Sequence, residues 1–318
     1  MSSVTEALNR IRGFISGVFM GNDYAINVLL ATVMAGGHAL LMGPVGSGKT
    51  TLAKALAKAI GGSFKRVQVT NETLPSDILG FVAYTRDGEA RVVKGPIFAN
   101  VVLLDEINRA PPRTLSALLE AMQEAQVTLD GNPLQLPKPH VILATMNVEE
   151  VELGITRQLP IAVLDRFMAS LTIGYVDRDN ERRILSSLNS IESMVNSRDN
   201  NPKVIDDFLD LMDQASRVYA SDDVIDYIMN ITDAIRSDGR LLLPLSTRAS
   251  ISVLKLSRAI ALLNGRDYVT PDDVKVAVPP ALSHRIILRP EFANTLRPID
   301  VINDALNRVQ PPVYMVTE

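Results

Sequence analysis

The stretch GPVGSGKTTLAKALAKAI, residues 43–60, joins a glycine-rich loop to an alanine- and leucine-rich run of helical character. Residues 43–50 have the spacing of a phosphate loop, in which glycines let successive backbone N–H groups wrap a phosphate. A short apolar strand precedes the loop and a helix follows it, so the positive end of the helix dipole would face the same phosphate. The stretch predicts a nucleotide site, and an ordinary flexible loop ahead of a helix is the competing interpretation.

In a phosphate loop the lysine reaches the β- and γ-phosphates, and the hydroxyl that follows it binds magnesium. Lys49 and Thr50 occupy these two positions. The sequence therefore predicts ATP and Mg²⁺ as cofactors of this loop. The residues expected to contact the nucleotide are Gly43, Pro44, Val45, Gly46, Ser47, Gly48, Lys49, Thr50 and Thr51.

Two adjacent carboxylates follow the apolar run Val101–Leu104. A strand buried on both faces would carry them to the sheet edge at which ligands of parallel sheets bind. We expect Asp105 to hold Mg²⁺ and Glu106 to polarise the attacking water. Acids at the end of a strand are also common as plain solvated turn residues.

Three more polar side chains are candidates for the same site. Asn147 follows the apolar run 140–145, where its amide could hydrogen-bond the γ-phosphate and the attacking water together. Arg166 and Arg248 are either nucleotide contacts or ordinary surface ion pairs, and their spacing along the chain does not choose between the two.

Strand-length apolar runs alternate with helical segments through the first half of the chain, which is typical of a parallel sheet covered by helices. The expected strands are residues 38–42, 65–69, 101–104, 140–145 and 170–175, with helices at 50–60 and 114–124. Asp-Gly pairs at 87–88 and 130–131 predict two hairpins with two-residue turns, at about 80–95 and 126–138.

Beyond residue 177 the strand signals fade and amphipathic helices follow one another. We expect an α/β core over residues 1–176 with the two hairpins inserted in it, and a small all-α domain with a tail over residues 177–318. The expected helices are residues 179–188, 204–219, 222–237, 246–263, 271–278 and 300–309, with a loop at 197–202.

Composition limits the classes of function. Among its 318 residues, 47% are hydrophobic and 21% charged, and the formal net charge is −4. With no cysteine, the chain can form no disulfide and has no thiol nucleophile or thiolate metal site. The mixed signs of its charges disfavour a nucleic-acid partner.

Residues 24–48 carry no formal charge, but Gly36 and Gly37 divide them into pieces too short to span a membrane. Without a recognisable signal peptide, we expect a cytoplasmic protein with no membrane insertion.

Several motifs together resemble those of the MoxR-type AAA+ ATPases, a branch with a helix-2 insert that is related to magnesium chelatase ATPase subunits. They are the phosphate loop and the runs VVLLDEINRAPPRTLSALLEAMQE (101–124), QVTLDG (126–131), ATMN (144–147), LDRF (164–167) and GRDYVTPDDV (265–274). The resemblance covers roughly residues 15–285. It implies an AAA+ P-loop NTPase fold with a five-stranded parallel sheet of order 5-1-4-3-2, a helical lid, and a homo-hexameric ring with nucleotide at each subunit boundary.

The resemblance also implies a role for each candidate residue. Residues 43–50 match Walker A, Asp105 and Glu106 match Walker B, and Asn147 matches sensor 1. Arg166 matches the arginine finger that acts on the neighbour's nucleotide, and Arg248 matches the sensor 2 arginine. The two hairpins match the helix-2 insert and the pre-sensor-1 hairpin, and the family places adenine near Phe19 and Met20. This chain departs from the usual family pattern at Val148 and Thr247, where proline is customary.

The leading hypothesis is an ATPase that hydrolyses ATP to drive chaperone-like remodelling, assembly or metal insertion in client protein complexes. Similar proteins often work with a von Willebrand factor A domain partner. The alternatives are a nucleic-acid-stimulated motor and an oligomeric scaffold that nucleotide gates with little turnover. A magnesium-chelatase-like motor is the nearest other enzyme, and no feature of the sequence marks a porphyrin site.

Overall fold

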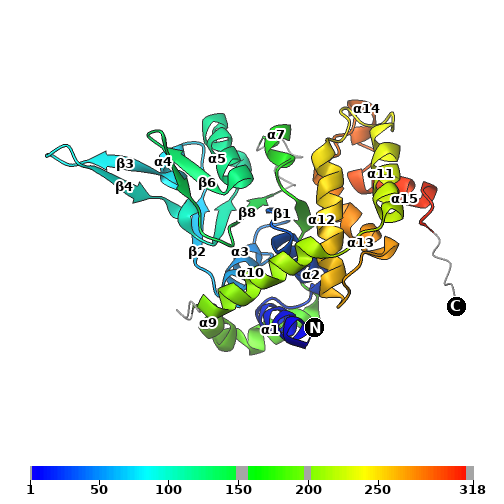
Figure 1. Ribbon diagram of the computed structural model, residues 1–318, viewed down its shortest axis with the longest axis horizontal. Coiled ribbons are helices and arrows are strands. Elements are labelled where there is room, and N and C mark those ends of the chain that lie inside the picture. Colours follow the sequence, from blue (N-terminus) through cyan, green and yellow to red (C-terminus); the bar gives the residue numbers. More distant parts are fainter. Residues whose placement is uncertain (1, 148–156, 197–201, 313–318) are drawn as a thin grey trace.

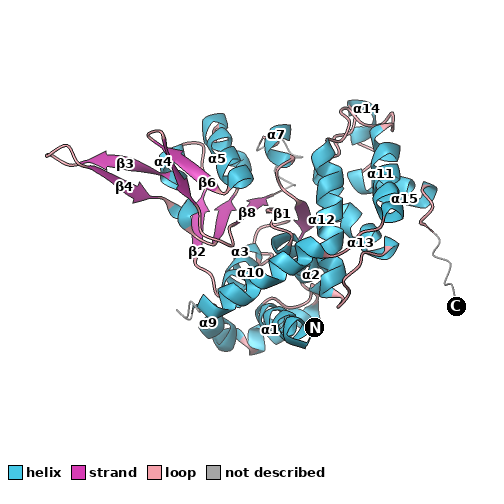
Figure 2. Cartoon of the chain, in the orientation of Figure 1, coloured by secondary structure: helices cyan, strands magenta, loops and turns pink. Residues whose placement is uncertain are grey.

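The computed structural model describes residues 2–147, 157–196 and 202–312. At its centre lies a parallel sheet of order β2-β5-β8-β1-β9 (Figures 1 and 2). Counted in chain order among these five alone, the strands read 5-1-4-3-2 from the β9 edge, which is the expected order. The strands are β1 (Ala39–Met42), β2 (Phe64–Gln68), β5 (Val101–Asp105), β8 (Val141–Met146) and β9 (Ala169–Thr172).

Side chains alternate between the two faces of the sheet, and each face belongs to a separate apolar cluster. One cluster includes α1 (Ser2–Val18), α2 (Asp23–Met34) and α3 (Lys49–Ala59). The other includes α4 (Pro75–Leu79), α5 (Pro112–Glu124) and α7 (Ile161–Leu164), with short 3₁₀ turns at Pro96–Phe98 and Ile107–Arg109. The strand residues of the first face are Ala39, Leu41, Val101, Leu103, Val141, Leu143, Ala169 and Leu171, and those of the second are Leu40, Val102, Leu104, Ile142 and Ala144.

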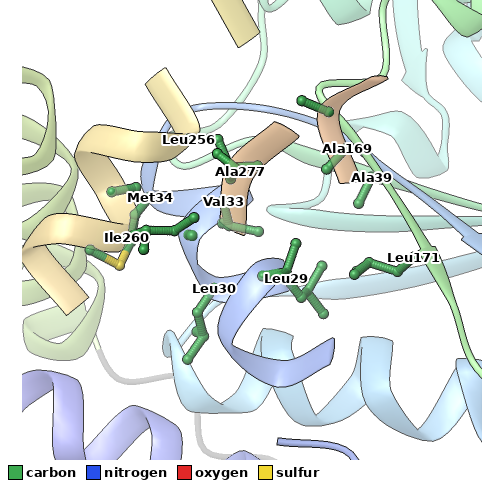
Figure 3. Packing of buried hydrophobic residues seen from close by; sticks show 14 of the residues in the cluster. Leu29, Leu30, Val33, Met34, Ala39, Ala169, Leu171, Leu256, Ile260 and Ala277 are labelled. Carbon is green, nitrogen blue, oxygen red and sulfur yellow. The ribbon is translucent and has the colours of Figure 1, made fainter. Parts of the chain in front are cut away.

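The second half of the chain is helical, as expected. Its helices join the first cluster, because α12 and α13 pack with α2 and β9 of the α/β half. Figure 3 shows Leu256, Ile260 and Ala277 beside Val33 and Met34. One apolar core therefore extends across residue 176, and the domain division there stays a prediction. The helices are α8 (Arg178–Ser186), α9 (Leu188–Asn196), α10 (Pro202–Arg217), α11 (Asp222–Arg236), α12 (Thr247–Leu263), α13 (Pro271–Leu282), α14 (Pro290–Ala293) and α15 (Pro298–Arg308), with a 3₁₀ turn at Ser283–Arg285.

Both predicted hairpins are present. The second joins β6 (Gln126–Leu129) to β7 (Asn132–Gln135) through Asp130 and Gly131, whose φ angles of 47° and 78° suit a two-residue turn. The first joins β3 (Gly80–Tyr84) to β4 (Ala90–Lys94). Its predicted two-residue turn is wrong, because Thr85 N–H bonds Glu89 O and leaves three residues in the loop.

Two helices differ from the sequence prediction. The predicted helix 179–188 ends at Ser186, and a separate helix, α9, follows it where none was expected. Helix α13 does not stop at Val278 but continues through Pro279 and Pro280 to Leu282. The burial of Ala281 and Leu282 offsets the backbone hydrogen bonds that the prolines remove. The loop predicted at 197–202 lies almost entirely outside the described residues.

None of the described helices is both long enough and apolar enough to cross a bilayer.

Burial keeps the three histidines of the chain neutral. His38 Nε2 donates to Met122 O at 3.0 Å while its Nδ1 accepts from Ile142 N–H at 3.1 Å, so the neutral ring satisfies both partners. Burial lowers the pKa of His38 to about 4, with a smaller effect from His140 beside it. Burial also lowers the pKa of His140 to about 4 and that of His284 to about 3.

These lowered pKa values predict acid sensitivity. The unfolded histidines bind protons below pH 6.5 while the folded ones do not, so stability is complete above that pH and falls as pH drops towards 4. Each histidine should remove about 2 kcal/mol of unfolding free energy between pH 7 and pH 5. Urea unfolding at the two pH values measures this loss. His140→Gln should lessen it, and an unchanged loss in that variant would contradict the assignment.

Candidate nucleotide-binding site

The carboxyl ends of three neighbouring strands meet at one edge of the sheet. The glycine loop follows β1, Asp105 ends β5 with Glu106 directly after it, and Asn147 follows β8. Together they line a cavity of about 390 Å³ that also contains loop residues 43 and 45–51. Pro44 does not line the cavity with its side chain, and its carbonyl contacts Lys49 instead.

The loop adopts the backbone that its glycines allow. Gly43, Gly46 and Gly48 have φ angles of 141°, 81° and 87°, and α3 begins directly after them at Lys49. The Lys49 ammonium donates to Gly43 O at 2.9 Å and to Pro44 O at 2.6 Å, so it occupies the concave side of its own loop. Burial lowers the pKa of Lys49, and the charges of Asp105 and Glu106 act in the opposite direction.

Asp105 is held on both of its carboxylate oxygens. The Thr145 hydroxyl donates a short hydrogen bond to Oδ1, and the guanidinium of Arg66 lies 2.6 Å from Oδ2. The Thr145 oxygen also accepts the Glu106 N–H at 2.9 Å, so one hydroxyl on β8 holds the Asp105 carboxylate and the Glu106 backbone. Thr145 and Arg66 line the same cavity, and the sequence analysis did not identify either. Strand β2 lies at the edge of the sheet and carries polar residues, and this pattern in the sequence could have pointed to Arg66.

Glu106 leaves the strand in a left-handed conformation, with φ 57° and ψ 48°. Few residues other than glycine adopt this conformation, and it marks a strained point where the strand ends. The Glu106 carboxylate forms an ion pair with Arg109, with 2.7 Å between Oε2 and Nε. Glu106 therefore lies at the rim of the cavity with one oxygen already held.

A second cavity, of about 610 Å³, continues from the loop past Gly46, Gly48 and residues 50–51. Phe19 and Met20 line it, where the resemblance implied adenine. Its opposite wall is α9, the helix that sequence reasoning missed, through Leu188, Ile191 and Val195. The spacing of these three apolar residues by three and four positions was the signal that could have revealed the helix.

Arg166 and Arg248 do not line the phosphate cavity of their own chain. The Arg166 guanidinium donates to Gln123 Oε1 at 2.8 Å, and Arg248 lies 3.5 Å from an Asp165 oxygen. Burial lowers the pKa of Arg166, and the charge of nearby Arg248 lowers it further. The fold thus brings these two arginines together beside Asp165, which the buried Arg285 also holds at 3.1 Å.

Comparison with known proteins gives the family. Residues 38–169 match the ATPase family associated with various cellular activities (AAA), and residues 233–305 match an AAA lid domain. Over 98% of its length the chain is 32% identical to Chaperone MoxR1 of Mycobacterium tuberculosis, covering 84% of that protein. The chain belongs to the MoxR-type AAA+ ATPases.

Two further comparisons cover almost the whole of this MoxR-type chain. It is 39% identical to the uncharacterized protein YeaC of Bacillus subtilis, covering 94% of this chain and 93% of the relative. A crystal structure from Cytophaga hutchinsonii, of a protein provisionally assigned as an ATPase, superposes with a TM-score of 0.85. That protein is 33% identical, and the match covers 98% of this chain and 96% of the other.

Two glycines of the loop should respond differently to substitution. A Cβ at Gly43 would lie 2.0 Å from Ile173 O, which is backbone, whereas a Cβ at Gly46 would meet no atom within 4 Å. Both positions have positive φ, so both alanine variants carry backbone strain, which is about 1 kcal/mol at Gly46. Gly43→Ala should cost about 2 kcal/mol more because Ile173 must move. Urea unfolding of the two variants measures the difference, and equal losses would contradict this account.

Proposed function

We propose that this MoxR-type chain binds MgATP at the phosphate loop and hydrolyses it to ADP and phosphate. The observation that carries the proposal is the single cavity in which Lys49, Asp105, Glu106 and Asn147 meet. A loop alone would support binding, whereas the added acids and amide supply what hydrolysis needs. The adjoining cavity beside Phe19 and Met20 is of a kind that suits adenine, since apolar side chains form much of its wall.

The residues present fit magnesium. Mg²⁺ in phosphate-binding sites takes one or two protein oxygens and completes its shell with waters and phosphates. Asp105 and Thr50 line the same cavity and offer a carboxylate and a hydroxyl oxygen. Among the described residues there is no cluster of three acidic or histidine side chains, which agrees with a metal held mainly by the nucleotide. Bound there, Mg²⁺ would neutralise phosphate charge.

The remaining side chains divide the chemistry. Lys49 releases the loop carbonyls that it now contacts and binds the β- and γ-phosphates. Glu106 orients and polarises the attacking water, and Asn147 hydrogen-bonds that water and the γ-phosphate. Thr145 supports the step by holding Asp105 and the backbone of Glu106 in place.

Arg166 completes the site of a neighbouring subunit in a homo-hexameric ring, and Arg248 is the nucleotide-binding sensor 2 arginine of the lid. The position of Arg166 outside its own phosphate cavity supports action across the boundary, because a cation can stabilise transition-state charge only if it reaches the phosphates. Asp165 and Gln123 hold the pair on one surface of the chain. A subunit by itself would then bind ATP and hydrolyse it slowly.

The work driven by hydrolysis is chaperone-like remodelling, assembly or metal insertion in client protein complexes. Support comes from the relative named Chaperone MoxR1, to which the chain is similar over nearly all of its length. A protein with a von Willebrand factor A domain is the partner that we expect in the same compartment, the cytoplasm.

A nucleic-acid-stimulated motor is a second candidate, favoured by one surface feature. The β3–β4 hairpin projects from the molecule (Figure 1). Its first strand exposes Phe81 and Tyr84, and the paired strand exposes Arg91 and Lys94. Aromatic and basic side chains together are what single strands bind. Turnover stimulated by single-stranded DNA and suppressed by salt would favour this candidate over the first.

Separate substitutions should distinguish binding from hydrolysis. Glu106→Gln should keep ATP binding and lower turnover about 100-fold or more, because the water loses its polarising carboxylate. Lys49→Ala should weaken ATP binding about tenfold or more, because the phosphates lose their charged donor. Calorimetry with ATP and a phosphate-release assay measure the two effects. Normal turnover in Glu106→Gln would contradict a role for Glu106 in the mechanism. Single-turnover rates near zero in the unaltered protein would favour the alternative of an oligomeric scaffold that nucleotide gates.

Mixing of subunits should reveal action across the boundary. Arg166→Ala alone should lower turnover by about 10³- to 10⁵-fold, as loss of an arginine finger does in other NTPases. Arg166→Ala subunits keep an intact phosphate loop, and Lys49→Ala subunits keep an intact Arg166. When the two are mixed in one ring, some subunit boundaries therefore combine the intact loop with the intact arginine. Partial recovery of phosphate release is the expected result. A mixture no more active than its components would contradict action in trans.

A further inference from the structure

Arg66 is a second cation in the phosphate cavity, in addition to Lys49. It lies on β2 two residues before Gln68, so the two side chains share one face of the strand. Gln68 pairs in register with Asp105 on β5, which brings Arg66 within reach of that carboxylate. The Arg66 guanidinium contacts Asp105 Oδ2 through Nη2 at 2.6 Å and through Nε at 3.1 Å, and Nη2 also donates to Gln68 Oε1.

The charge of the cavity depends on Arg66. Lys49 and Arg66 balance Asp105 and Glu106, so the formal charge of the lining side chains is zero. Without Arg66 the lining would carry a net negative charge at the place where a polyanion has to bind. Arg66 therefore favours phosphate binding even before its own contacts with a ligand are considered.

Arg66 would have to share the Asp105 carboxylate with a bound magnesium ion. Asp105 Oδ1 already accepts from Thr145, and Arg66 takes Oδ2 twice. A divalent cation held at Asp105 would be repelled by the guanidinium, because like charges at short distance disfavour one another. Arg66 can give way because its side chain is 47% exposed on an edge strand, whereas that of Asp105 is 14% exposed.

We infer that Arg66 is a further nucleotide-binding residue, whose guanidinium holds Asp105 before the cofactor arrives and binds the terminal phosphate of ATP once Mg²⁺ takes that carboxylate. The inference rests on the proposed function. A γ-phosphate is the anion that a displaced guanidinium in this cavity would meet, and a planar guanidinium suits phosphate oxygens well. Because ADP has no γ-phosphate, Arg66 makes the site prefer ATP over ADP.

Binding affinities measured without turnover test this inference. Dissociation constants for ATP and ADP are determined by calorimetry at saturating Mg²⁺ for the unaltered protein and for Arg66→Ala. We expect the preference for ATP over ADP to fall about tenfold, because the loss of Arg66 weakens ATP binding by more than ADP binding. The Mg²⁺ concentration that half-saturates ADP binding should also fall, because no guanidinium then competes for Asp105.

Two further variants serve as controls. Arg66→Lys keeps the charge without the planar fork and should retain more of the ATP preference than Arg66→Ala. Arg113→Ala removes an exposed arginine of α5 that does not line the cavity, and should leave both affinities unchanged. Thermal unfolding of each variant checks that it has folded.

Equal weakening of ATP and ADP in Arg66→Ala would overturn the inference, since Arg66 would then only support Asp105. Unchanged affinities for both nucleotides would overturn it as well. In either case the unaltered protein still binds ATP, and the proposed function stands. Failure of the unaltered protein to bind ATP would instead refute the proposed function together with this inference.

Discussion

The parallel pairing of β1 with β8 on one side and β9 on the other is the constraint on which the site depends. It places the loop after β1 between the ends of its neighbours, so Gly43 N–H bonds Met146 O and Ile173 N–H bonds Met42 O. The close approach of Gly43 to Ile173 leaves no room for a side chain. Because β5 pairs with β8 in turn, the two acids arrive at the same edge as the loop.

A network of charges and hydroxyls then sets the state of the site. Asp105 is shared by Thr145 and Arg66, Glu106 is paired with Arg109, and the Lys49 ammonium contacts its own loop. The charged groups that would act on a nucleotide, Lys49, Asp105 and Glu106, are thus already held by contacts within the chain. Binding would exchange these internal contacts for contacts with phosphate and metal, so the affinity reflects the difference between two sets of similar interactions.

Much of this could be predicted from short stretches of sequence. The loop from Gly43 to Thr50, the positions of the strands and the turn at Asp130–Gly131 depend on glycine conformations and apolar periodicity, which are local properties. The order of the strands was implied by the family resemblance alone. One prediction failed because packing outweighs local preference: helix α13 runs through two prolines while its far end is buried. Helix α9 was missed for another reason, since the local spacing of its apolar residues was overlooked.

By itself, the sequence determined that a phosphate loop, two adjacent acids and an asparagine follow strands of one parallel sheet, since strand length and side-chain alternation are written locally. Only the tertiary structure decided that Arg66 lies on Asp105, and that Arg166 and Arg248 gather beside Asp165 away from their own phosphate cavity. These contacts join residues far apart in the chain. They depend on how strands pair and on where helices pack, which no local pattern specifies.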